Sequence, residues 1–156
     1  YIFKAYSYFL RMLGNSSDFK RNNLFVKLAC NRIQKKLDKL DYDLIFAPGS
    51  TYITYLNTEK PIVIWADATF KSLINSYPQY SNLPKSQFNA GNIIEKTALE
   101  NCSKLIFSTT WAAKSAMEDY NIDDSKIDIS NLANGIYYLV LTSPNQVISK
   151  SFSIIR

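Results

Sequence analysis

The chain has 156 residues, a net charge of +5, 47% hydrophobic and 20% charged residues, and no histidine. This composition is typical of one globular domain with room for a core. The lack of histidine excludes Ser-His-Asp and Cys-His catalysis and most zinc sites, and two cysteines are too few for a disulfide scaffold. No apolar run approaches the roughly 20 residues of a membrane span.

The charge is concentrated at the amino-terminal end. Residues 1–39 hold nine Lys and Arg against Asp18 and Asp38, so they carry +7, and the other 117 residues sum to −2. Such a region can touch an anionic membrane surface or polyphosphate, and a solvated helix face is the other interpretation.

In chain order, we expect an aromatic-rich helix over residues 1–13, a break at 14–18, and a helix over Arg21–Leu40. The buried stripe of that helix is predicted at Val26, Ala29, Ile33, Leu37 and Leu40. The remaining helical segments are expected over Thr51–Leu56, Ala68–Asn75, Ala90–Asn101 and Trp111–Tyr120, with a long loop at Ser76–Gln87. Short apolar runs at 43–47, 61–66 and 104–107 predict strands.

These runs are continuously apolar and are separated by helical segments, a pattern that favours a parallel sheet covered on both faces. In such sheets, ligands bind at the carboxyl ends of the strands. The polar residues at those ends are Ser50, Thr51, Asp67, Ser108, Thr109 and Thr110. The pattern therefore predicts a polar ligand at one edge of an α/β sheet.

The sequence pattern of the last part of the chain differs from the alternation of helices and strands before it. Residues 127–155 read as turn, strand, turn and strand, with Asn134-Gly135 before the first strand and Ser143-Pro144 after it. We expect an antiparallel β-hairpin, which needs to pack on another element because a lone hairpin is marginally stable.

The region of about 43–126 resembles the amino-terminal half of a family-four glycosyltransferase with the GT-B fold. The stretches that carry the resemblance are DLIFAPGSTYITYL, PIVIWADATF, YPQYSNL and NIIEKTALENCSKLIFSTTWAAKSAMEDYNIDDSKI. The resemblance implies that 1–126 is a partial, Rossmann-like amino-terminal domain with flanking helices, on the acceptor side of the cleft. It implies transfer of a hexosyl-type sugar from a nucleotide-sugar to a glycan acceptor, with no metal, no cofactor and no nucleic acid.

In that family a second domain binds the nucleotide-sugar donor. The stretches matched here do not include it, and the chain begins at Tyr1 rather than Met. We therefore expect a fragment that does not transfer sugar by itself. The expected location is cytoplasmic and membrane-peripheral, with the basic region 1–39 facing anionic lipid.

Residues 127–156 are similar to the end of a type IX secretion sorting domain of the Bacteroidetes kind. The matching stretch is IDISNLANGIYYLVLTSPNQVISKSFSIIR. This resemblance implies a secreted or cell-surface, non-enzymatic protein, which is the alternative function. The two resemblances disagree about the compartment.

Each candidate site residue has two interpretations. Ser50 and Thr51 either bind an acceptor hydroxyl or phosphate, or cap a helix. Asp67 either binds a sugar hydroxyl or acts as a base, or caps the helix over Ala68–Asn75. The other predicted substrate contacts are Ser108, Thr110 and Trp111. Trp65 and Trp111 are expected to pack in the core unless they stack on sugars. We expect the side chains of Glu95 and Glu100 to be solvated. Cys30 and Cys102 are expected to be small buried hydrophobes.

Overall fold

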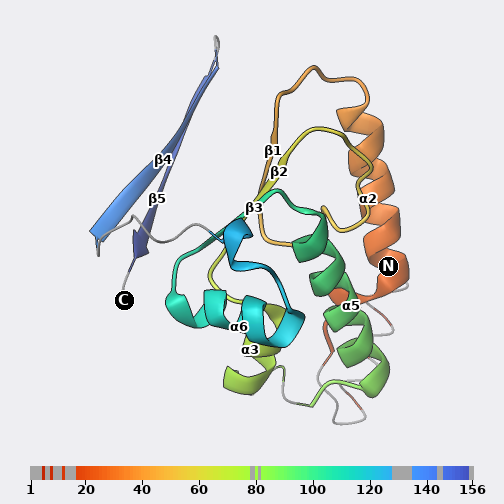
Figure 1. Ribbon diagram of the computed structural model, residues 1–156. Coiled ribbons are helices and arrows are strands. Elements are labelled where there is room, and N and C mark those ends of the chain that lie inside the picture. Colours follow the sequence, from red (N-terminus) through yellow and green to blue (C-terminus); the bar gives the residue numbers. More distant parts are fainter. Residues whose placement is uncertain are drawn as a thin grey trace.

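The computed structural model describes residues 5, 8, 12, 17–77, 80, 82–127, 135–143 and 146–154. In these residues the protein is mixed α/β, with helices flanking a three-stranded parallel sheet (Figure 1). The sheet has the order β1–β2–β3, built from Ile45–Pro48, Ile62–Ala66 and Lys104–Phe107. The predicted α/β class and parallel sheet are thereby confirmed.

The helices described are η1 (Phe19–Arg21), α2 (Asn23–Leu37), α3 (Phe70–Ser76), α5 (Lys85–Asn101), α6 (Thr110–Tyr120) and η2 (Asp124–Lys126). Two boundaries correct the sequence prediction. Leu40 lies beyond the end of α2 and is 62% exposed, because the backbone leaves the helix at Asp38 although the apolar spacing continues. Helix α5 begins at Lys85 rather than Ala90, with Pro84 at the N-cap, so residues 85–87 of the predicted loop belong to the helix.

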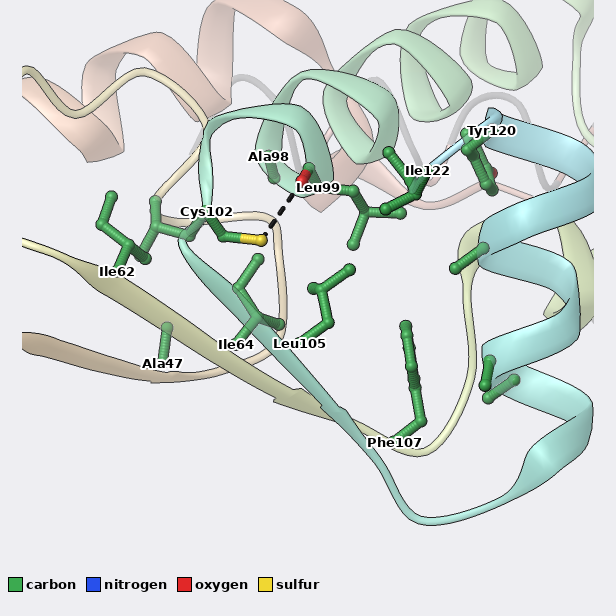
Figure 2. Packing of buried hydrophobic residues seen from close by; sticks show 14 residues of the cluster. Ala47, Ile62, Ile64, Ala98, Leu99, Cys102, Leu105, Phe107, Tyr120 and Ile122 are labelled. Atoms are coloured by element: carbon green, nitrogen blue, oxygen red, sulfur yellow. Dashed lines mark hydrogen bonds between the residues drawn. The ribbon is translucent and has the colours of Figure 1, made fainter. Parts of the chain in front are cut away.

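The core lies on one face of the sheet. The register places Ile64 between Ala47 and Leu105, and these side chains are buried together with Ile62 and Phe107. They pack against residues of α5 and α6, as Figure 2 shows. On the opposite face the described side chains of Phe46, Val63, Trp65 and Ile106 are only half-buried.

Helix α2 packs beside α5. Val26 and Cys30 of α2 are buried against Ile94 of α5. The chain between β1 and β2 is hydrogen-bonded to both helices. Thr54 Oγ1 donates to the Ile94 carbonyl of α5 (3.3 Å), and the Cys30 thiol of α2 donates to the Tyr52 carbonyl (3.3 Å). The predicted helix at Thr51–Leu56 is a series of turns instead, closed by bonds such as Ile53 N–H to the Ser50 carbonyl.

After α6 the chain returns to the sheet. Ile127 forms an isolated parallel bridge with Leu105 of β3. Beyond it, β4 (Gly135–Ser143) and β5 (Gln146–Ile154) pair antiparallel in a sheet of their own. The turn at 144–145 and the side chains of both strands lie outside the described residues, so the expected β-hairpin stays a prediction. The predicted helix over 1–13 also lies mostly outside them.

Gly91 of α5 lies against the ring of Phe70 in α3. A Cβ at this position would overlap the ring of Phe70. Alanine is the better helix former by about 1 kcal/mol, so a destabilising Gly91→Ala substitution isolates the clash. We expect a loss of about 1–3 kcal/mol in the free energy of unfolding, measured in urea. Asn89→Ala on the exposed side of α5 is the control, and a Gly91→Ala protein as stable as the native chain would contradict this packing.

Candidate functional site

The carboxyl ends of β1 and β2 enclose a hollow of about 240 Å³. We call it the strand-end hollow. Its lining residues are Pro48, Gly49, Trp65, Ala66, Asp67, Ala68 and Leu73. It lies at the edge of the sheet where open α/β proteins bind their ligands, and where the sequence predicts the site.

The turn after β1 forms one wall of the strand-end hollow. Gly49 has a φ of +113°, a conformation that side-chain-bearing residues rarely adopt, and its N–H bonds to the Ala47 carbonyl (2.9 Å). This turn carries the chain away from the hollow at Ser50. The backbone at Gly49 is therefore open to a ligand, whereas the Ser50 side chain is 5% exposed.

Ser50 belongs to a buried ionic network. Its hydroxyl donates to the Glu95 carboxylate (2.7 Å), and Arg21 Nη1 donates to the same oxygen (2.7 Å). Glu95 is 2% exposed, and the Arg21 guanidinium lies over the Phe70 ring at 4.5 Å from its centre. A carboxylate at this depth needs an ionic partner and further hydrogen bonds, and Glu95 has both.

The expectation that Glu95 is solvated is therefore wrong. Glu95 lies four residues after buried Gly91 and three before buried Ala98, a spacing that places it on the apolar stripe of α5. That spacing is the sequence signal from which the burial of Glu95 could have been predicted. The partner that makes its burial possible, Arg21, lies 74 residues away in the chain.

The other strand ends have separate roles. Asp67 is exposed and does not cap α3, because Thr69 does so in a capping box with Ser72. The capping interpretation of Asp67 is therefore wrong, and its carboxylate stands at the strand-end hollow. At the end of β3, Ser108 Oγ accepts a hydrogen bond from Trp65 Nε1 (3.3 Å), and Thr109 caps α6.

The remaining predicted residues lie apart from the strand-end hollow. Thr51 is half-buried in the turns after β1, and Thr110 is exposed at the start of α6. Trp111 is 45% exposed, so the expectation that it packs in the core is wrong. It lines a second hollow of about 260 Å³ between α3 and α6.

Neither thiol has the features of a nucleophile. Cys30 and Cys102 are buried, as predicted, and are free thiols. Burial raises the pKa of Cys102 to about 11 and also raises the pKa of Cys30, so both stay protonated near neutral pH. Among the described side chains, no three His, Cys, Asp or Glu residues gather as metal ligands would.

Comparison with protein-family models, curated proteins and solved structures found no match to this chain. Both resemblances seen in the sequence stay predictions. The functional argument rests on the geometry of the site.

The buried network should dominate the stability of this part of the fold. Arg21→Met leaves the Glu95 carboxylate buried without its cation, and we expect a loss of about 3–5 kcal/mol in the free energy of unfolding. Lys114→Met is the matched control, because the Lys114–Glu118 pair (3.6 Å) is exposed and such pairs are worth at most about 1 kcal/mol. Equal losses in the two variants, measured by urea denaturation, would contradict the assigned burial.

Proposed function

We propose that this chain forms the acceptor side of the cleft in a GT-B glycosyltransferase, with its parallel sheet as part of a Rossmann-like domain. The strand-end hollow carries the proposal. It lies at the carboxyl ends of two parallel strands and is lined by Trp65 and Asp67. The ordered sequence stretches over residues 43–126 support the same assignment.

The lining of the strand-end hollow suits a sugar. An indole supplies an apolar surface for a sugar ring, and a carboxylate accepts hydrogen bonds from sugar hydroxyls. Asp67 is also the residue placed to take a proton from an attacking hydroxyl. Gly49 allows a ligand to approach the backbone closely.

The same lining favours the acceptor over the donor. Its seven residues include one acid and no Lys or Arg. The diphosphate of a nucleotide-sugar is usually held by cations or by a helix N-terminus. A neutral glycan therefore fits this hollow better, and the donor is assigned to another part of the enzyme.

The path of the chain after α6 agrees with a larger sheet. The parallel bridge of Ile127 with Leu105 follows the strand–helix–strand alternation of β2, α5, β3 and α6. A Rossmann-like domain continues in this way beside its third strand.

The function is tested on the product of the whole native gene, with release of nucleoside diphosphate from a nucleotide-sugar as the signal. Asp67→Asn should lower kcat/KM for the acceptor by about tenfold or more, because the side chain keeps an accepting oxygen but loses the charge that strengthens the hydrogen bond and the ability to take a proton. The matched control is Glu59→Gln, an exposed acid in the loop before β2 and so at the opposite end of that strand. Full activity of Asp67→Asn, or no glycan-dependent release by the native enzyme, would overturn the proposal.

A peripheral membrane contact is a second proposal, and the exposed face of α2 favours it. Leu24 and Leu28 are 60% and 49% exposed, and they share this face with exposed Arg32 and Lys35. No helix in the described part of the chain is long and apolar enough to span a bilayer. A helix with apolar and basic side chains on one face can lie on an anionic surface without crossing it.

Replacing Arg32 and Lys35 together by Gln should weaken binding to anionic phosphatidylglycerol vesicles by about thirtyfold, since each cation near such a surface contributes about 1 kcal/mol. Co-sedimentation measures the change. The double control Lys96→Gln and Lys114→Gln removes two exposed lysines from α5 and α6. Equal binding to neutral phosphatidylcholine vesicles, or binding insensitive to salt, would refute the contact.

A further inference from the structure

The hollow between α3 and α6 has no role in the proposal above. We call it the α3–α6 hollow, and its volume is about 260 Å³. Its lining residues are Ser72, Trp111, Lys114, Ser115, Glu118 and Asp119. One aromatic ring, two carboxylates, two hydroxyls and an ammonium group thus surround one space.

Trp111 supplies the apolar part of this hollow. It is the second residue of α6 and keeps 45% of its surface exposed, although neighbouring Ala112 and Ala113 are buried in the core. An indole held at the rim of a hollow offers a flat apolar area to a ligand. The C–H face of a sugar ring is a ligand of that shape and size.

The polar part is held in place by hydrogen bonds. Thr69 and Ser115 share a hydrogen bond of 2.6 Å, and the Ser115 hydroxyl donates to the Asp119 carboxylate (2.6 Å). The Lys71 ammonium lies 2.9 Å from the other oxygen of Asp119. Burial alone would raise the pKa of Asp119, but the bonds from Ser115 and Lys71 outweigh it and lower the pKa, so the carboxylate remains an acceptor near neutral pH.

The charges at this hollow balance in pairs. Lys71 lies beside Asp119, and Lys114 lies beside Glu118 (3.6 Å). A phosphate would meet two carboxylates, and a cation would meet the Lys114 ammonium and two carboxylates that already have cationic partners, so neither ion is favoured. A neutral ligand with many hydroxyls can bond to both kinds of group without an unpaired charge.

We propose that the α3–α6 hollow is a second carbohydrate site, in which a neutral sugar residue stacks on Trp111 and donates hydroxyl hydrogen bonds to Glu118 and Asp119. Ser72 lines this hollow and the adjacent Leu73 lines the strand-end hollow, so the two sites meet at α3. The site does not depend on sugar transfer at Asp67.

The chain contains two tryptophans, and each of them lines one hollow. In the ¹⁵N-labelled 156-residue chain their two indole N–H signals therefore report separately on the two sites, once Trp65→Phe and Trp111→Phe variants assign them. The probes are neutral trisaccharides of glucose, mannose, galactose and N-acetylglucosamine at millimolar concentration. Glucose 6-phosphate is the anionic comparison.

We expect at least one neutral trisaccharide to shift the Trp111 signal saturably. Backbone amide signals of α6 then measure affinity in the variants. Trp111→Ala should weaken binding by about tenfold and Trp111→Phe by about threefold, because the aromatic face is lost in one and reduced in the other. Tyr52→Ala, which removes another exposed aromatic ring away from both hollows, should leave the affinity unchanged.

The outcomes separate the two proposals. A saturable shift of the Trp111 signal in the native chain, together with weaker binding at the α6 backbone amides in Trp111→Ala, supports the α3–α6 site, whatever happens at Trp65. A shift of Trp65 alone overturns this inference while it supports acceptor binding at the strand-end hollow. No shift of Trp111 with any neutral trisaccharide, or a larger shift with glucose 6-phosphate, also overturns it.

Discussion

The carboxylate of Glu95 lies almost fully buried, and the surrounding structure is arranged to keep it there. It accepts hydrogen bonds from Arg21 in η1 and from Ser50 in the turn after β1, while it is itself part of α5. Three segments that are distant in the sequence are thus joined at one oxygen. Because an unpaired charge at this depth is costly, each segment has a defined position relative to the other two.

This constraint shapes the strand-end hollow. The Ser50 hydroxyl is held inward, so Gly49 and Pro48 face the ligand side of the turn. The predicted ligand contact at Ser50 is thereby replaced by a structural one, although its turn still forms a wall of the site. Asp67 is left as the exposed carboxylate in the lining.

A second polar chain, from Thr69 through Ser115 to Asp119 and Lys71, links α3 to α6. The two hollows meet at α3, so both proposed carbohydrate contacts depend on how this short helix is held. The Phe70 ring, packed on Gly91 and under Arg21, ties α3 to the Glu95 network. The two sites therefore share one structural support, although their ligands are separate.

The sequence alone determined the three parallel strands, because these depend on local apolar runs separated by helical segments. Only the tertiary structure decided the burial of Glu95 and the exposure of Trp111. Helical spacing places both residues near an apolar stripe, but which side chains become buried depends on the partner that packs there. Arg21 lies 74 residues from Glu95, and a local sequence pattern cannot predict a contact between residues that far apart in the chain.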